Sequence, residues 1–256
     1  MIMKHVCGLE SYQLLTGKDN YLSESERGQV RMITERLLRR EPIQYVLGTT
    51  EFCAMTFRVT PAVLIPRPET EELVEYIYMS ERGKKLRILD IGTGSGCIAI
   101  SLAKKLREAD VCAVDISDEA LGVAKKNAEK NAVAVSFVKA DILSGQAEEL
   151  PFYGETDIIV SNPPYVLQSE KSAMEENVLA YEPSTALFVP DDDPLVFYRA
   201  IAELGKKQLT PGGRLYFEIN AAYGKETVAL LEEHGYKEII LKPDFYGKDR
   251  MIKAVL

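Results

Sequence analysis

The sequence contains no tryptophan, only two histidines and only four cysteines. The histidines, His5 and His234, lie far apart, and neither has the spacing of a metal-binding pair or a suitable nucleophile nearby. The cysteines are Cys7, Cys53, Cys97 and Cys112, and they form no C-x-x-C pair. A disulfide framework, a metal site and histidine-based acid–base catalysis are therefore not expected.

Long apolar runs and an excess of positive charge are also absent. No stretch approaches the roughly 20 apolar residues of a membrane span, and the N-terminus has no signal-type apolar core. With 31 basic and 39 acidic residues the formal net charge is −8, and no basic run is longer than Leu38-Arg39-Arg40. We therefore expect a cytoplasmic protein with no membrane contact. Long nucleic acid is a disfavoured partner, which leaves room only for a local basic groove.

The composition is that of an ordinary globular protein. The chain has 256 residues, 46% of them hydrophobic, which is enough for one or two domains with a buried core. Its first part shows helical periodicity, including Leu9 to Leu15, and Ser23 with Glu26 three positions later predicts a capped helix start. The expected divisions are a small helical N-terminal domain at 1–48, a hairpin linker at 49–64 and a second domain at 65–256.

After residue 48 the pattern changes from helical to extended. Two short runs, Thr50–Phe52 and Thr56–Val59, predict the hairpin. From residue 86 strand-like and helical runs alternate, which predicts an α/β fold with a doubly wound, mostly parallel, seven-stranded Rossmann-like sheet. The expected strands are residues 87–90, 111–115, 135–138, 157–160, 214–218, 237–241 and 251–255. The expected helices are residues 69–79, 97–107, 118–130, 193–209 and 224–234.

The first expected strand runs into a glycine-rich turn with the pattern G-x-G-x-G at Gly92, Gly94 and Gly96. A dinucleotide fingerprint would have its third glycine at position 97, which is Cys97 here, so the spacing points away from a pyrophosphate. Asp115 ends the second strand, where a carboxylate can accept both hydrogen bonds of a ribose diol. Together these features indicate an adenosine-type cofactor. The competing interpretations are a bare structural turn and, for Asp115, a helix cap before Ser117.

Two more acids stand near this edge of the predicted sheet. Asp141 follows the third strand and can reach an adenine amino group, or it is simply an exposed strand-end residue. Asp90 either caps the glycine turn or reaches the ammonium group of the cofactor, and the sequence does not separate these roles.

A second motif, Asn162-Pro163-Pro164-Tyr165, follows an apolar strand. The prolines stiffen the backbone and remove two N–H donors, leaving the Asn162 side chain and the backbone carbonyls as acceptors for an –NH₂ group. Because an amide or exocyclic amine is a poor nucleophile, two fixed acceptors would turn its lone pair toward an electrophile, with Tyr165 against the planar group. The alternative is a turn that merely ends the strand.

The glycine turn, Asp115 and the tetrad together resemble class I S-adenosylmethionine-dependent methyltransferases that methylate planar amino groups. The rest of the chain resembles the release factor glutamine methyltransferases (PrmC/HemK family). The segments that carry this second resemblance are Pro42–Gly48, Val63–Glu71, Tyr181-Glu182-Pro183, Ala186-Leu187, Pro211-Gly212-Gly213 and Asp249-Arg250. It implies methyl transfer from S-adenosyl-L-methionine to the glutamine amide nitrogen (N5) in the Gly-Gly-Gln loop of class I peptide chain release factors.

The resemblance also implies roles for individual residues. The methionine part of the cofactor would lie against Gly92, Thr93, Gly94, Ser95 and Gly96, the ribose against Asp115, and the adenine against Asp141 and Ile142. Asn162 and the Pro163 carbonyl would orient the glutamine amide, with Pro164 and Tyr165 completing the catalytic tetrad. The Arg67-Pro68-Glu69-Thr70 turn would form a wall of the active site, and Glu182 would be a nearby structural or substrate-side acid. The alternatives are an interdomain salt bridge for Arg67 and a loop cap for Glu182. The helical domain would recognise the substrate, and a monomer is expected.

The chain departs from the family pattern at two places. The common E-I-G-x-x-Q-G is Glu218-Ile219-Asn220-Ala221-Ala222-Tyr223-Gly224 here, and a usual glycine-leucine is replaced in Asp193-Pro194-Leu195. Both bear on loop shape or partner contact more than on chemistry. Two other functions stay open, namely an adenine-N6-type amino-group methyltransferase acting on DNA or RNA and a non-catalytic binding module with the same fold.

Overall fold

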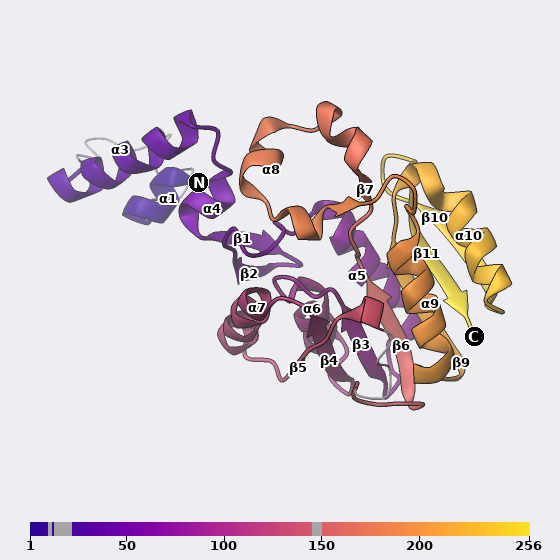
Figure 1. The fold of residues 1–256 in the computed structure, drawn as a ribbon. Coiled ribbons are helices and arrows are strands. Elements are labelled where there is room, and N and C mark those ends of the chain that lie inside the picture. Colours follow the sequence, from indigo (N-terminus) through magenta and orange to yellow (C-terminus); the bar gives the residue numbers. More distant parts are fainter. Residues whose placement is uncertain (10–11, 13–21, 145–149) are drawn as a thin grey trace.

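The computed structural model describes residues 1–9, 12, 22–144 and 150–256, and Figure 1 shows their arrangement. The N-terminal part contains α1 (Ile2–Cys7), α3 (Glu24–Leu38) and α4 (Ile43–Leu47). The predicted capping box is confirmed, because the Ser23 hydroxyl accepts from the Glu26 N–H while the Glu26 carboxylate accepts from the Ser23 N–H. The helical pattern expected at Leu9 to Leu15 lies mostly outside the described residues.

A hairpin of β1 (Thr49–Phe52) and β2 (Met55–Arg58) follows, as the alternation predicts. Its two turn residues, Cys53 and Ala54, have φ values of 49° and 57°, which is the left-handed geometry that matches strand twist but usually selects Asn-Gly. The hairpin packs on the second part of the chain: Asn127 in α7 (Asp118–Asn131) accepts from the Arg58 N–H and donates to its carbonyl.

The central sheet has seven strands in the order β10-β11-β9-β6-β3-β4-β5. Their bounds are β3 Arg87–Ile91, β4 Asp110–Asp115, β5 Ser136–Lys139, β6 Thr156–Ser161, β9 Leu209–Glu218, β10 Lys237–Pro243 and β11 Asp249–Val255. Neighbouring strands pair in parallel from β9 to β5, whereas β11 runs against both of its neighbours. The predicted seven-stranded, mostly parallel α/β sheet is confirmed.

Helices cover both faces of this sheet, as a doubly wound fold requires (Figure 1). One face packs on α5 (Pro68–Glu81), α6 (Cys97–Lys105) and α7, and the other on α9 (Val196–Gln208) and α10 (Gly224–Glu233). The helix expected from residue 193 begins at Val196, because Asp193 lies in the preceding turn and pairs with Arg199.

The chain between β6 and β9 forms short elements that no sequence pattern predicted. They are β7 (Val166–Leu167), η3 (Gln168–Ala173), α8 (Glu176–Tyr181), η4 (Ser184–Ala186) and β8 (Phe188–Val189). The strands β7 and β8 pair in parallel, and α8 contacts the N-terminal helices through Tyr181, whose hydroxyl donates to the Arg39 carbonyl at 2.9 Å. Three-residue elements η1 (Ile142–Ser144) and η5 (Ala221–Tyr223) follow β5 and β9. The segment from Val166 to Val189, called the excursion after β6 below, brings residues back over the carboxyl edge of the sheet.

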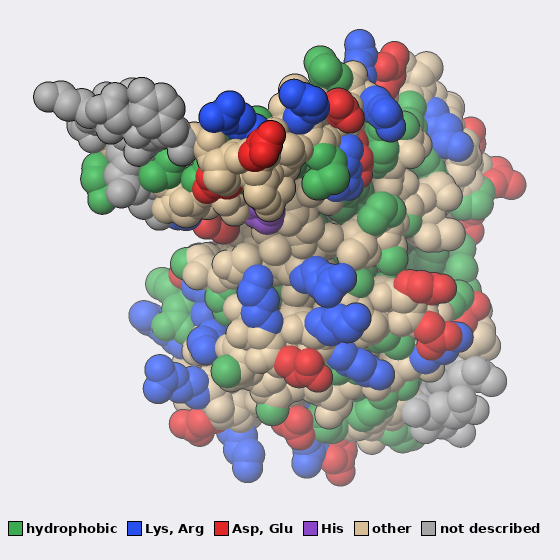
Figure 2. All heavy atoms as spheres, turned by 90° about the vertical axis from the view of Figure 1, so that its left-hand side faces the viewer, with side chains coloured by type: hydrophobic (Ala, Val, Ile, Leu, Met, Phe, Trp, Pro, Cys, Tyr) green, Lys and Arg blue, Asp and Glu red, His purple; other side chains and the backbone are tan. Residues whose placement is uncertain are grey.

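Lysine and arginine side chains gather on the face below the N-terminal helices, where α7 lies (Figure 2). Lys125, Lys126 and Lys130 of α7 are all exposed there. The protein therefore has a local basic surface although its formal net charge is −8. Over the described part of the chain, every helix is too short or too polar to cross a membrane.

Candidate functional site

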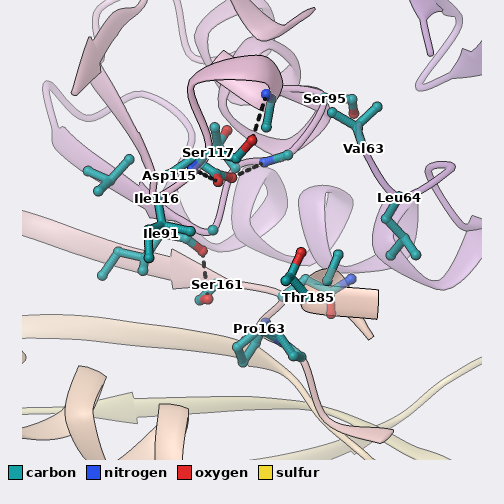
Figure 3. Close-up of a pocket in the computed structure, with 18 of the residues that line it drawn as sticks. Val63, Leu64, Ile91, Ser95, Asp115, Ile116, Ser117, Ser161, Pro163 and Thr185 are labelled. Atoms are coloured by element: carbon teal, nitrogen blue, oxygen red, sulfur yellow. Dashed lines mark hydrogen bonds between the residues drawn. The ribbon is translucent and has the colours of Figure 1, made fainter. Parts of the chain in front are cut away.

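A cavity of about 450 Å³ lies at the carboxyl ends of β3, β4 and β6. The chain leaves β3 toward β4 and β5 on one side and returns to β6 on the other, and such a switch point is where this sheet class binds ligands. Figure 3 shows Asp115, Ile116 and Ser117 on one side of the cavity and Val63 and Leu64 on the other. The cavity thus lies between the glycine turn with Asp115, the tetrad after β6 and a segment that precedes the sheet.

The glycine turn has the backbone that its sequence predicts. Gly92, Gly94 and Gly96 all have positive φ, at 70°, 53° and 81°. A Cβ on Gly92 or Gly94 would meet no other atom within 4 Å, so the turn presents bare backbone where it lines the cavity. Gly96 has a different reason to be glycine, because a Cβ there would lie 2.9 Å from Ile100 Cδ1 and 3.1 Å from Ala124 Cβ. It is the close-packing position that starts α6.

Asp115 lines the cavity at the end of β4 (Figure 3). Its Oδ2 accepts from the Gly94 N–H at 2.8 Å, and its Oδ1 accepts from the Ser117 N–H at 3.0 Å. Ser117, not Asp115, is the N-cap of α7, since its hydroxyl accepts from the Ala120 N–H. Asp115 therefore fastens the glycine turn to β4 and holds a carboxylate at the cavity wall.

Asp90 is completely buried beneath the glycine turn. Its Oδ2 accepts from the Thr93 hydroxyl at 2.6 Å and the Ala99 N–H at 3.1 Å, so it caps the turn and the start of α6. Its Oδ1 has no hydrogen-bond partner among the described residues. Burial raises the pKa of this carboxyl to about 7. Of the two roles open for Asp90, the structure supports capping of the turn.

Three of the four residues of the tetrad after β6 line the cavity, and the fourth packs in the interior. Asn162, Pro163 and Pro164 line the cavity. Tyr165 does not, because its ring packs against the core below α9 and its hydroxyl donates to Glu218 Oε1 at 3.2 Å. The sequence expectation that Tyr165 lies against the planar substrate group therefore has no counterpart in the cavity lining. Ser161, at the end of β6, donates its hydroxyl to the Ile91 carbonyl at 2.7 Å and ties β6 to β3 (Figure 3).

Asn162 has a partner that the sequence did not indicate. Its Nδ2 donates to Thr70 Oγ1 at 3.2 Å, and the Thr70 hydroxyl donates to Glu218 Oε2 at 2.7 Å. Glu218 is 1% exposed, and burial raises the pKa of its carboxyl. No hydrogen-bond partner of Asn162 Oδ1 is present in the described part of the chain, so that atom is a free acceptor on a residue that lines the cavity.

The remaining expected residues lie at the cavity or just behind it. Asp141 and Ile142 line it, and Asp141 Oδ1 accepts from the Leu143 N–H at 2.9 Å. Arg67 also lines it, and its guanidinium donates to Glu182 Oε1 at 2.6 Å. Glu182 is buried outside the lining, where its Oε2 accepts from the Ile65 N–H. Arg67 and Glu182 therefore form a salt bridge with each other inside the second part of the chain, while Arg67 also lines the cavity.

Several lining residues had not been expected. They are apolar or small side chains from the segment before α5, from the end of β4, from the chain between β6 and β9 and from α9, among them Leu64, Ile116, Thr185, Phe188 and Phe197. Ile116 could have been found from the sequence, because it is an apolar residue directly after Asp115. In the structure it is 58% exposed and forms part of the cavity wall. The others come from segments whose approach depends on the tertiary fold.

Comparisons with known proteins place this chain among relatives of known name. Residues 1–48 match the model of the PrmC N-terminal domain, and residues 69–183 match the Methyltransferase small domain. The chain is 50% identical to the "Release factor glutamine methyltransferase" of Bacteroides thetaiotaomicron over 99% of this chain and 90% of that protein. It is 51% identical to the protein of the same name from Flavobacterium psychrophilum, over 96% of this chain and 86% of that one.

Among solved structures, the fold is similar to a ribosomal protein L11 methylase from Lactobacillus delbrueckii subsp. bulgaricus. The TM-score is 0.52 at 24% identity, over 76% of this chain and 81% of that chain, which shows a shared fold. The near full-length identity to the first two relatives shows more than a fold. On that evidence the chain belongs to the release factor glutamine methyltransferase family.

Proposed function

We propose that this protein transfers the methyl group of S-adenosyl-L-methionine to the side-chain amide nitrogen (N5) of the glutamine in the Gly-Gly-Gln loop of class I peptide chain release factors. The amide nitrogen would displace S-adenosylhomocysteine in line from the methyl carbon, without a covalent enzyme intermediate, and the methylated nitrogen would then lose one proton to solvent. The names of its relatives support the substrate, and the free amide acceptor of Asn162 in the cavity supports the chemistry. That free acceptor is the observation on which the proposal mainly depends.

The cavity suits a cofactor of this type. Its volume of about 450 Å³ lies within the roughly 300–1,000 Å³ of small-molecule sites. The bare backbone at Gly92 and Gly94 leaves room for the methionine part, beside Thr93, Ser95 and the end of the turn at Gly96. The Asp115 carboxylate offers two acceptor oxygens to a ribose diol. Asp141 and Ile142, with Ile116, would hold the adenine. When bound, S-adenosylmethionine supplies an electrophilic methyl group on a sulfonium.

The protein's own part is to position the amide. Asn162 Oδ1 and the Pro163 carbonyl would accept the two hydrogens of the glutamine –NH₂ group, which aims the nitrogen lone pair away from both acceptors. An amide in this geometry needs no strong base to begin the transfer, and the cavity lining contains no histidine. Pro164 would keep the backbone rigid, and Tyr165 would support the tetrad from the interior.

The flanking residues would serve the protein substrate. We propose that Arg67 stands at the substrate side of the cavity and that Glu182 holds it there. We also propose the domain division 1–48, 49–64 and 65–256, with the helical part recognising the release factor. The contact of Tyr181 with Arg39 supports this division of labour, because it connects the helical part to the excursion that covers the site.

The test is incorporation of labelled methyl from S-adenosylmethionine into a purified, unmethylated class I release factor. Its Gly-Gly-Ala variant, unmodified DNA and unmodified RNA are assayed beside it. The exposed lysines of α7 are the reason to include both nucleic acids. Label in the wild-type release factor alone supports the proposal. Label only in nucleic acid would identify an adenine-type enzyme, and label nowhere without cofactor binding would leave a non-catalytic module.

A further inference from the structure

Two residues outside the tetrad connect Asn162 to the protein interior. Thr70, in the first turn of α5, and Glu218, the last residue of β9, are 2% and 1% exposed. The chain of hydrogen bonds runs from Asn162 Nδ2 to Thr70 Oγ1 over 3.2 Å and from the Thr70 hydroxyl to Glu218 Oε2 over 2.7 Å. These residues come from three separate elements, so their contact is made only by the packing of α5 on the sheet edge.

While Glu218 is ionised, its carboxylate fixes the order of donors and acceptors along this chain of hydrogen bonds. Both Glu218 oxygens accept from hydroxyl groups, Oε2 from Thr70 and Oε1 from Tyr165. A threonine hydroxyl has one proton, and Thr70 uses it on Glu218. Toward Asn162 the Thr70 oxygen can therefore only accept, which requires Asn162 to present its Nδ2.

The orientation of the Asn162 amide follows from this order. With Nδ2 held by Thr70, Oδ1 is the atom left free. If the amide turned by 180°, Oδ1 would face the Thr70 oxygen, which has no proton left, and one buried hydrogen bond would be lost. The turned amide would also present an N–H donor to the substrate, which cannot hold an –NH₂ group.

We infer that Thr70 and Glu218 are positioning residues that fix the polarity of the Asn162 amide, so that it presents an acceptor to a primary amide. This inference rests on the proposed function. It assigns a role to Thr70 that is separate from binding, since Thr70 acts through Asn162. It also gives a role to the buried Glu218 at the end of β9, where each carboxylate oxygen accepts from one of the two hydroxyls.

The direct test is Thr70→Val, which keeps the shape and removes the hydroxyl. We expect turnover to fall about tenfold, the usual effect of one lost hydrogen bond at a buried polar group, with the Kd for S-adenosylmethionine unchanged. Thr70→Ser should restore turnover because it restores the hydroxyl. Thr227→Val is the matched control, since Thr227 is equally buried and its hydroxyl donates to Tyr223 at 2.7 Å in α10, away from the cavity.

A mutant cycle separates positioning from packing. In an Asn162→Ala background, Thr70→Val should cause no further loss of turnover, because the side chain on which it acts is gone. An equal loss in both backgrounds, or wild-type turnover in Thr70→Val, would overturn the inference. Glu218→Gln offers one acceptor oxygen to two hydroxyls, so its turnover should lie between wild type and Thr70→Val. Unchanged turnover there would remove Glu218 from the chain.

A second measurement needs no activity at all. Solvent exchange of the Asn162 side-chain amide protons, followed by nuclear magnetic resonance in labelled protein, should be about tenfold faster in Thr70→Val than in wild type or Thr227→Val. Equal exchange in all three would refute the contact. If the wild-type protein fails to methylate a release factor, the proposed function falls, while this measurement still decides the inference.

Discussion

Gly96→Ala offers a direct test of how the glycine turn is built. Gly96 combines a φ of 81° with tight packing, since an added Cβ would lie 2.9 Å from Ile100 Cδ1, 3.1 Å from Ala124 Cβ and 3.3 Å from Ala124 Cα. Gly92 has a similar φ of 70° but no atom within 4 Å of its added Cβ. Comparing the stability of Gly96→Ala with that of Gly92→Ala therefore separates the cost of backbone strain from the cost of a steric clash.

The magnitudes follow from these two terms. A left-handed conformation costs an alanine roughly 1–2 kcal/mol, and this term applies to both variants. The clash applies only to Gly96→Ala. The Ile100 methyl can move aside, but Ala124 Cα is backbone in α7 and cannot, so overpacking should add about 1–3 kcal/mol. The lower entropy of the unfolded alanine variant is common to both and cancels in the comparison.

The assay is urea unfolding of both variants beside wild type. We expect the Gly92→Ala midpoint to fall slightly and the Gly96→Ala midpoint to fall further, with equal m-values for all three proteins. In a thermal scan the extra loss would correspond to about 2–4 °C for each kcal/mol. Equal midpoints for the two variants would refute the reasoning, because the packing against α7 would then cost nothing.

Three further outcomes follow from single residues. Asp115→Ala should weaken binding of S-adenosylmethionine at least about tenfold by titration calorimetry, because the acceptor oxygens and the anchor of Gly94 are both lost, and an unchanged Kd would contradict this. Folding raises the pKa of Asp90 to about 7, so at pH values between about 4 and 7 the folded protein holds a proton that the unfolded chain has released. The stability that this proton contributes is fully present below about pH 4 and is lost by about pH 7, so wild type should lose stability relative to Asp90→Asn between about pH 4 and 7 and change little above that. Parallel melting profiles would be the contrary result. Ala54→Gly should stabilise the hairpin turn by about 1 kcal/mol in urea unfolding, since Ala54 has a φ of 57°, and a lower midpoint would count against that strain.

Local patterns in the sequence were sufficient for much of the fold. The alternation of apolar runs predicted the seven strands of the sheet, because strand and helix periodicities are properties of neighbouring residues. The glycine turn and Asp115 were found for the same reason, since they lie at successive strand ends of one strand–helix–strand unit. The short elements between β6 and β9 had no such signal, because segments of two to six residues are too short to show a period.

The sequence by itself determined which motifs meet at the carboxyl edge of the sheet, because parallel strands place the residues that follow them at one edge. Only the tertiary structure decided how the motifs are supported. It turned Tyr165 inward to Glu218, paired Arg67 with Glu182 and placed Thr70 against Asn162. The partners in these contacts are 53 to 115 positions apart in the chain, so no local spacing encodes them. They depend on how α5 and the chain between β6 and β9 pack against the carboxyl edge of the sheet.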